Sequence, residues 1–394
     1  MPFSYLANEL KDLEASGLRR QRRVLESQQG ARIVVDGKDY LSFCSNDYLG
    51  LASHPALIEA AQLAAARYGV GAGASHLVSG HSVLHHELEA ALAAFAGQPA
   101  ALLFSTWYMA NLGIITALAG RDDEVFADKL NHASLNDAVL LSRAKFTRYP
   151  HLDLEALEKR LAASTAKRKL VVTDAVFSMD GDMALVPELL DLCERYDALL
   201  VLDDAHGFGV LGRTGRGILE HFDLLSPSSP SPLASRLIYM ATLGKAAGVF
   251  GAFVAGSAEL TDYLVQRARS YIYTTATPPL LSAALIASLQ LIEKEVWRRE
   301  HLRELIACLR QGLKLRRWRL MDSTTPIQPV IIGSNQETLA VSEALRERGI
   351  WVPAIRPPTV PKGEARLRIT LSADHSLEDV AQLVVALNEL EQDG

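Results

Sequence analysis

The stretch "LLVLDDAHG" at residues 199–207 is a short apolar run that ends in two acids and a histidine. A continuous apolar run of this length, bounded by polar residues and glycine, is typical of a strand that is buried on both faces. Two similar runs lie nearby, "KLVVTDAVF" at 169–177 and "RLIYMATL" at 236–243, and the helical pattern "VPELLDLCERYDA" at 186–198 separates the first two runs. Buried strands that alternate with helices predict an α/β fold with a large, mainly parallel sheet.

Polar side chains follow each of these three runs. In a parallel sheet the carboxyl ends of the strands meet at one edge, and ligands bind beyond that edge. Asp203 and His206 end the run at 199–207, and Lys245 is the only charge in "MATLGKAAGVFGAFVAGSA" at 240–258. A turn with acidic caps and a lysine that extends to water are the structural alternatives. Two acids and a histidine within four residues favour a functional site.

Lys245 and Asp203 have the chemistry that pyridoxal 5'-phosphate (PLP) requires. A lysine amine kept from water is more readily deprotonated, and it can then form a Schiff base with an aldehyde. PLP offers this aldehyde, and its pyridinium nitrogen needs an acid as partner. Gly244 and Gly248 allow a close approach of the backbone around the lysine. The sequence therefore predicts a PLP site at this edge of the sheet.

Three further segments fit the same cofactor. In "FSTWYMAN" at 104–111 a strand is expected to end at Phe104 and a helix to begin near Tyr108, and helix N-termini bind phosphate. In "FSMDGD" at 177–182, Ser178 lies at another strand end. His132, in "DKLNHASLNDA", offers a planar ring that can stack on a pyridine.

The composition bounds the class of protein. The chain has 394 residues with a net charge of −6, and 49% of them are hydrophobic and 22% charged. These values are typical of a globular protein and argue against bulk affinity for nucleic acid. Three separated cysteines, Cys44, Cys193 and Cys308, favour a reducing compartment over disulfides or zinc. With no signal-peptide pattern and no apolar run of membrane-spanning length, we expect a cytoplasmic protein without membrane or nucleic-acid partners.

Two other motifs suggest different functions. "GFGVLG" at 207–212 satisfies the dinucleotide pattern G-x-G-x-x-G, but no acid follows about twenty residues later, which disfavours an NAD-dependent oxidoreductase. The histidines of "SHLVSGHSVLHHELE" at 75–89 include His81 and His85, which could share a helix face and bind a metal ion. Because H-E-x-x-H is absent, we expect a helix start here and no metal site. "GLRRQRR" at 17–23 is expected to be a solvated basic face.

Three parts are expected along the chain: an N-terminal segment at 1–50, a large PLP-binding domain at 51–280 and a small domain at 281–394. The last part begins with a long helical pattern. It continues with "IQPVIIG", "LAVSEALRERG" and "ARLRITLSA", a strand–helix–strand pattern that predicts a smaller α+β domain. The proline-rich "SPSSPSP" at 226–232 is expected to be a surface loop.

Six stretches between about residue 19 and residue 375 resemble those of the α-oxoamine synthases. These stretches are "FCSNDYLGL", "DKLNHASL", "VFSMDGD", "DDAHGFGVLG", "TLGKAAG" and "ARLRITLSADH". The family belongs to the fold-type-I, aspartate-aminotransferase-like PLP enzymes, and it condenses an amino acid with an acyl-CoA while carbon dioxide is lost. The resemblance covers nearly the whole chain and implies a PLP-dependent acyltransferase.

The resemblance also implies a role for each matching residue. The implied catalytic residues are Lys245, which holds the cofactor and removes the α-proton, Asp203 at the pyridinium nitrogen, His132 stacked on the ring and His206 at the phenolic oxygen. The other implied cofactor contacts are Trp107, Tyr108, Ser178, Thr242, Thr274 and Thr275. The implied substrate contacts are Arg19, Asn46, His132, Thr359 and Arg368, with Arg368 on the carboxylate of the amino acid. Thr274 and Thr275 resemble the segment that reaches the phosphate of the neighbouring subunit, which implies a homodimer with shared active sites.

Two stretches indicate which substrates to expect. "GASHLVSGHS" at 73–82 and "AIRPPTVPKGEARLRITLSADH" at 354–375 resemble the branch of the family that acts in biotin biosynthesis. That resemblance implies L-alanine and pimeloyl-CoA, or a pimeloyl-carrier protein, as substrates. The alternative is another α-oxoamine synthase that uses glycine or a different acyl-CoA.

The chain departs from the family at two positions. Trp107 stands where the family has glycine, and Phe208 replaces a smaller residue after "DDAHG". We expect both bulky side chains to reshape the substrate pocket while the Schiff-base chemistry stays intact.

Overall fold

The structure is a computed structural model that describes residues 3–16, 18–20, 22–225 and 236–393. The chain divides into two compact units, one formed by Asn46–Leu302 and the other by Met1–Ser45 together with Arg303–Gly394. The proline-rich segment expected to be a surface loop, 226–232, lies outside the described residues.

This division differs from the expected boundaries at 50/51 and 280/281 in two places. The N-terminal residues belong to the smaller unit, because strand β2 (Lys38–Ser42) pairs in parallel with β12 (Ile350–Trp351). Residues 281–302 belong to the larger unit, since helix α12 (Pro279–Lys294) packs against α2 (Pro55–Tyr68). Pairing and packing between segments far apart in the sequence therefore decide both boundaries.

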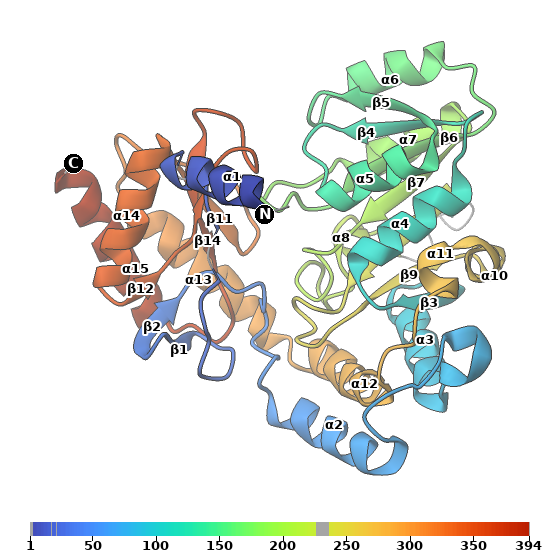
Figure 1. The fold of residues 1–394 in the computed structure, drawn as a ribbon, viewed down its shortest axis with the longest axis horizontal. Coiled ribbons are helices and arrows are strands. Elements are labelled where there is room, and N and C mark those ends of the chain that lie inside the picture. Colours follow the sequence, from blue (N-terminus) through green and yellow to red (C-terminus); the bar gives the residue numbers. More distant parts are fainter. Residues whose placement is uncertain (1–2, 17, 21, 226–235, 394) are drawn as a thin grey trace. The chain divides into compact units, whose positions relative to one another are not determined.

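The larger unit is built on a seven-stranded sheet with the order β3-β9-β8-β7-β6-β4-β5. Figure 1 labels its strands except β8. In that order the strands are Ala100–Phe104, Ala252–Gly256, Leu237–Thr242, Ala198–Asp203, Lys169–Asp174, Glu124–Asp128 and Lys145–Tyr149. Strand β9 runs antiparallel to both of its neighbours, and the other neighbouring pairs are parallel. The three strands expected from the sequence are β6, β7 and β8, side by side at the centre, so the mainly parallel sheet is confirmed.

Besides α2 and α12, the helices that begin in this unit are η1 (His76–Gly80), α3 (Val83–Phe95), α4 (Trp107–Leu118), α5 (Ala133–Ser142), α6 (Leu154–Ala163), α7 (Val186–Arg195), α8 (Ile218–His221), α10 (Ala258–Arg267), α11 (Arg269–Ile272) and α13 (Trp297–Gly312), whose last residues belong to the smaller unit. Helices α3 and α10 pack against β3, α4 against β8 and β9, and α6 against β4 and β5. Side chains of α4 and α5, such as Ile114 and Leu135, form one buried cluster with Val172 and Val201 of the sheet. Helix α7 packs against β7. Because each fully buried aliphatic side chain contributes about 1.5–3 kcal/mol, this core holds the strand ends firmly.

The smaller unit contains two sheets. One has the order β1-β2-β12, with β1 at Arg32–Val35. The other has the order β10-β11-β14-β13, and its strands are Arg319–Leu320, Ile327–Gly333, Ala365–Thr370 and Ala354–Ile355. The helices that lie wholly within this unit are α1 (Ser4–Ala15), α14 (Asn335–Glu347) and α15 (Leu377–Asp393). Strand β11, helix α14 and strand β14 are the strand–helix–strand pattern expected from the sequence, so the α+β character is confirmed.

The long helical pattern expected from residue 279 onward forms two helices rather than one, because α12 ends at Lys294 and α13 begins at Trp297. Among the described residues, none of the helices combines the length and the apolar character that crossing a membrane requires.

Candidate active site

Lys245, Asp203 and His206 gather at the carboxyl ends of β7 and β8. Asp203 ends β7 with 1% of its surface exposed, and Lys245 lies three residues after β8 with 7% exposed. The Lys245 Nζ is 2.9 Å from His206 Nε2. The parallel pairing of β7 with β8 therefore brings together the acid, the imidazole and the amine that the sequence places about forty residues apart.

Tyr48 extends this group toward Asn46. Its hydroxyl is 2.6 Å from His206 Nδ1 and donates a hydrogen bond to Asn46 Oδ1 at 3.1 Å. The His206 ring therefore lies between the Tyr48 hydroxyl and the Lys245 amine, with one ring nitrogen toward each of them.

Asp203 is a buried carboxylate held on both oxygens. The Asn111 amide donates to Oδ2 at 2.8 Å, and the Ala205 backbone N–H donates to Oδ1 at 3.0 Å. Burial raises the pKa of Asp203, and the nearby Lys245 and the Asn111 amide oppose this rise. A carboxylate kept in such surroundings has a strong preference for a cationic partner.

The adjacent Asp204 has a different task. Its Oδ2 accepts hydrogen bonds from the Ile218 backbone N–H and the Tyr239 hydroxyl, both at 2.8 Å. Burial raises its pKa to about 7. These contacts pin the loop after β7 to β8, so Asp204 supports the fold, whereas Asp203 faces the other ionisable groups of the site.

His132 stands at the N-terminus of α5. Its backbone N–H donates to the Asp174 carboxylate at 2.6 Å, and its Nδ1 accepts the Ser134 backbone N–H at 3.2 Å. Burial lowers the pKa of His132, Asp203 raises it and Lys245 lowers it further, which places the ring within the field of both groups. Asp174, which ends β6, is also buried; its burial and the charge of Asp203 raise its pKa.

The indole of Trp107 points into this group. Trp107 Nε1 donates to His132 Nδ1 at 3.4 Å, the two ring centroids are 5.3 Å apart, and the indole centroid is 4.9 Å from Lys245 Nζ. Trp107 and Tyr108 open helix α4, where backbone N–H groups have no acceptor within the helix. The Tyr108 hydroxyl donates to Asp137, and its side chain is 36% exposed.

Phe208 does not line the pocket, in contrast to the expectation. It is 1% exposed and packs against Phe95 and Phe253, with ring centroids 5.2 and 5.4 Å away. The Phe208 side chain, which replaces a smaller one, is therefore accommodated in the core, where it packs against these two aromatic rings. Of the two departures from the family, only Trp107 reaches the site.

The remaining expected cofactor residues lie on loops of the larger unit. Ser178 is half-buried in the loop after β6, which the Val176–Met183 bridge closes. The Thr242 hydroxyl donates to the Gly251 carbonyl at 3.1 Å and accepts the Gly244 N–H at 3.3 Å. Thr274 and Thr275 lie between α11 and α12, on a segment that the Ala276 N–H joins to the Ala74 carbonyl at 2.9 Å.

Three expected substrate contacts belong to the smaller unit. Arg19 forms an exposed ion pair with Glu14, in which the nitrogen and oxygen are 2.6 Å apart. Arg368 lies in β14 and is 5% exposed, and Thr359 is exposed. Asn46, like the His132 described above, is an expected substrate contact in the larger unit, and it accepts a hydrogen bond from Tyr48. The substrate roles of all five residues stay predictions.

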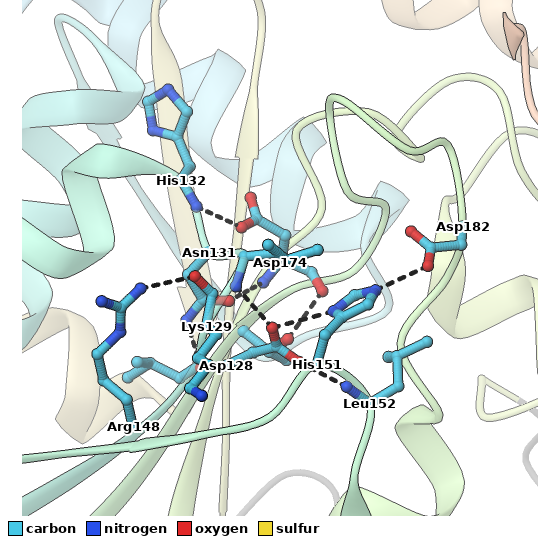
Figure 2. A network of polar contacts seen from close by, with 12 residues as sticks. Asp128, Lys129, Asn131, His132, Arg148, His151, Leu152, Asp174 and Asp182 are labelled. Atoms are coloured by element: carbon cyan, nitrogen blue, oxygen red, sulfur yellow. Dashed lines mark hydrogen bonds and ion pairs between the residues drawn. The ribbon is translucent and has the colours of Figure 1, made fainter. Parts of the chain in front are cut away.

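A second polar network supports the loop that carries Ser178 (Figure 2). His151 Nδ1 is 3.0 Å from Asp128 Oδ1, and its Nε2 is 2.7 Å from Asp182 Oδ2 in that loop. Burial disfavours the charged ring, but the hydrogen bonds to the two carboxylates outweigh it and raise the pKa of His151 to about 10. In the same network the Asn131 Oδ1 accepts the Asp174 N–H at 3.2 Å. The His151 imidazolium therefore ties the Ser178 loop to the end of β4.

The raised pKa of His151 gives a prediction about stability. Because the folded pKa lies above the unfolded value of 6.5, the ion pairs stabilise the fold fully below pH 6.5, and this contribution disappears as the pH rises through about 10. His151→Gln should therefore cost about 1–2 kcal/mol at pH 6.5, after a discount for partial exposure, and much less above pH 10. Thermal unfolding of both proteins across this range checks it, with exposed His221→Gln as control. A difference that does not change with pH would contradict it.

Sequence reasoning missed three residues of the site: Tyr48, Asn111 and Asp174. Asp174 was signalled, since it is the acid inside the "KLVVTDAVF" run. Asn111 lies one helical turn after Trp107, so it shares a face of α4 with a residue already assigned to the site. Tyr48 carried no signal apart from its place in the quoted "FCSNDYLGL".

Comparison with known proteins shows the family to which the chain belongs. The family model of the class I and II aminotransferases matches residues 38–387. An 8-amino-7-oxononanoate synthase of Nitrosospira multiformis is 64% identical over 95% of this chain and 93% of its own length. The synthase of Nitrosomonas europaea is 62% identical over 98% of this chain and 99% of its own length.

Solved structures of similar proteins point to the same family. A serine palmitoyltransferase of Sphingomonas wittichii is 30% identical, with a TM-score of 0.91 over 100% of this chain and 98% of that one. An 8-amino-7-oxononanoate synthase of Francisella tularensis is also 30% identical, with a TM-score of 0.76 over 90% and 97% of the two chains. The buried amine and carboxylate at the strand ends, the fold and these identities lead to one conclusion: the chain belongs to the class I and II aminotransferase family and, within it, to the 8-amino-7-oxononanoate synthases.

Proposed function

We propose that the protein is a PLP-dependent acyltransferase that condenses L-alanine with a pimeloyl thioester. The products are 8-amino-7-oxononanoate, carbon dioxide and the free thiol, in biotin biosynthesis. The observation that carries this proposal is the buried group of Lys245, Asp203 and His206, with the partly buried His132 nearby, in a chain 64% identical to an 8-amino-7-oxononanoate synthase.

The residues present fit PLP. Asp203 is a buried carboxylate suited to a pyridinium cation, and the His132 ring lies near both Asp203 and Lys245. Asn111, which holds Asp203, keeps a buried Oδ1 without a hydrogen-bond partner. The first-turn amides of α4 at Trp107 and Tyr108 are suited to a phosphate, together with Ser178 and Thr242. When bound, PLP supplies an aldehyde for Lys245 and an electron-withdrawing ring for the α-carbon of alanine.

The protein side chains provide the proton transfers and the positioning. Lys245 is the base that removes the α-proton of alanine. His206 Nε2, at 2.9 Å, accepts an N–H from Lys245 and so orients the amine lone pair. Tyr48 contacts the opposite side of the His206 ring and is itself bound to Asn46, which fixes the orientation of the ring. Burial of Lys245 and Asp203 excludes water from the site, which strengthens the electrostatic contacts.

Four residues are proposed to bind the substrates. Arg368 binds the carboxylate of alanine as a bidentate partner, and Arg19, Asn46 and Thr359 contact the acyl substrate. Both pimeloyl-CoA and a pimeloyl-carrier protein offer the same thioester chemistry.

The protein acts in the cytoplasm as a homodimer, in which Thr274 and Thr275 serve the partner's cofactor phosphate. Large apolar side chains are exposed on the larger unit, which favours a protein–protein interface. Those more than half exposed include Leu63, Val70, Leu77, Val78, Leu140, Leu141 and Tyr273.

The proposal is tested by free-thiol release from purified, cofactor-loaded protein. Pimeloyl-CoA and a pimeloyl-carrier protein, each with L-alanine, are compared with shorter acyl-CoAs and with glycine. Release that requires both a pimeloyl thioester and alanine is the expected result. Faster release with glycine or a shorter acyl chain would overturn the substrate assignment and support the alternative synthase.

Trp107 gives a prediction about cofactor and chain length. Its indole contacts His132 and Lys245, so Trp107→Gly should weaken PLP binding about 3- to 10-fold, the equivalent of one aromatic contact, and should change the acyl-chain preference. Trp107→Phe keeps an aromatic face and should lose less. PLP titration and thiol release with a series of acyl-CoAs check both effects. Unchanged affinity together with unchanged preference in Trp107→Gly would contradict the assignment.

A further inference from the structure

Three histidine rings meet at the turn before helix α3, away from the residues assigned to catalysis. Each of the residues His76, His81 and His85 offers one ring nitrogen, and these three nitrogens lie within 4.8 Å of one another. Their ring centroids are 5.0, 5.2 and 5.6 Å apart, and His76 Nδ1 is 2.9 Å from His81 Nδ1. The sequence placed only His81 and His85 on one face and favoured no metal site. The structure adds His76 as the third ring.

We propose that His76, His81 and His85 form a binding site for a divalent transition metal of the zinc type. In a tetrahedral site with zinc–nitrogen bonds of about 2.0–2.1 Å, ligand nitrogens are about 3.3 Å apart and imidazole centroids about 5 Å apart. The observed centroid separations are close to this arrangement, and the three ring nitrogens, which lie within 4.8 Å of one another, would move closer together when an ion binds. Imidazole nitrogens suit zinc, copper and nickel, and the hard oxygen-seeking ions magnesium and calcium are disfavoured.

The local backbone is shaped to bring the rings together. Residues 76–80 form a single π-helical turn, in which the Gly80 N–H donates to the Ser75 carbonyl at 2.9 Å. A Cβ at Gly80 would lie 2.0 Å from the Ala74 carbonyl oxygen, so only glycine allows the turn to close. The turn places His76 beside His81, and the first turn of α3 then presents His85 to both.

The surroundings hold one of the rings and add an acidic group, Glu89, whose pKa burial raises to about 7. His76 stacks on Tyr271, with centroids 5.0 Å apart and planes 12° from parallel. Glu89, one helical turn after His85, places Oε2 3.9 Å from His81 Nε2 while its Oε1 accepts the Leu103 N–H. A carboxylate beside the second nitrogen of a ligating imidazole supports metal binding and compensates charge.

His85 has a further connection. It is fully buried, its Nδ1 accepts the Ser82 N–H at 2.9 Å, and its Nε2 is 2.8 Å from the Thr277 carbonyl. Coordination exchanges one of these hydrogen bonds for the metal bond, so His76 and His81 should contribute more of the affinity. A bound ion would join the turn at 74–81 to α3 and to the segment that carries Thr274 and Thr275.

The test is equilibrium dialysis of the full-length, cofactor-loaded protein against Zn²⁺ after chelator treatment, with bound zinc counted by elemental analysis. We expect about one ion per chain. His76→Gln and His81→Gln should each weaken binding by more than about 100-fold, because residues that only support a ligand already change affinity about 10- to 100-fold.

His86→Gln is the matched control: His86 lies on the same helix next to His85 and its ring meets the edge of the His81 ring, with centroids 6.3 Å apart, but it offers no nitrogen to the cluster. It should bind zinc as the parent protein does. The far-ultraviolet circular dichroism and the PLP content of each variant show that lost binding is not lost folding. Zinc affinity unchanged in both His76→Gln and His81→Gln, or an equal loss in His86→Gln, would overturn the site. None of these readouts depends on thiol release, so the proposed function is tested separately.

Discussion

Lys245→Ala is expected to lower thiol release by at least about 10²- to 10⁴-fold, the range for loss of a general base, and to remove the covalent attachment of PLP as well. The reason is that Lys245 is buried, with 7% of its surface exposed, and its Nζ lies 2.9 Å from His206 Nε2. An amine from the solvent cannot take its place there. Thiol release measures the first effect, and borohydride trapping followed by peptide mass spectrometry measures the second.

Lys245→Arg separates nucleophilicity from charge. The guanidinium keeps a positive charge in the same place, but it is not deprotonated in proteins and forms no Schiff base. It should therefore be as inactive as Lys245→Ala. Lys159→Ala, a change at an exposed ion pair on α6, is the control and should keep full activity. Substantial activity in Lys245→Arg would show that only the charge matters, against the proposed role.

Asp203→Asn is expected to lower thiol release by about 10²- to 10³-fold, comparable with loss of one preorganised electrostatic contact. The change keeps the volume and one acceptor for Asn111, but it removes the negative charge that would hold a pyridinium nitrogen protonated. Steady-state kinetics at saturating PLP and the pH dependence of the cofactor absorbance measure this effect.

Asp204→Asn is the matched comparison for this prediction. Asp204 is equally buried and adjacent, but its carboxylate is bound to the Ile218 N–H and the Tyr239 hydroxyl. Its change should lower the thermal unfolding midpoint and alter turnover per folded, loaded protein much less. Equal loss of turnover in the two variants would mean that burial of any acid at this loop matters, rather than the charge at Asp203.

Much of the fold was predictable because it depends on short-range patterns. The runs that form β6, β7 and β8 are apolar throughout, a pattern typical of strands covered on both faces, and helical periodicity separates the first two. The boundaries of the units were not predictable. They depend on the pairing of β2 with β12 and on the packing of α12 against α2, and single-chain periodicity says nothing about such partners.

The sequence by itself determined the chemistry of the site: one lysine in an apolar run, an acid and a histidine at the neighbouring strand end, and glycines that permit close approach. These features are local, so composition and spacing reveal them. Only the tertiary structure decided which other side chains form hydrogen bonds with these site residues. Tyr48 reaches His206 and Asn111 reaches Asp203 across gaps of 158 and 92 residues.

The same reason explains the two bulky departures from the family and the histidine cluster. Trp107 and Phe208 look alike as large side chains in a site motif, yet Trp107 lies against Lys245 and Phe208 packs between Phe95 and Phe253. His76 joins His81 and His85 only because the turn closed at Gly80 brings it back. The direction of a side chain depends on which neighbours exclude or accept it, and those neighbours come from distant parts of the chain.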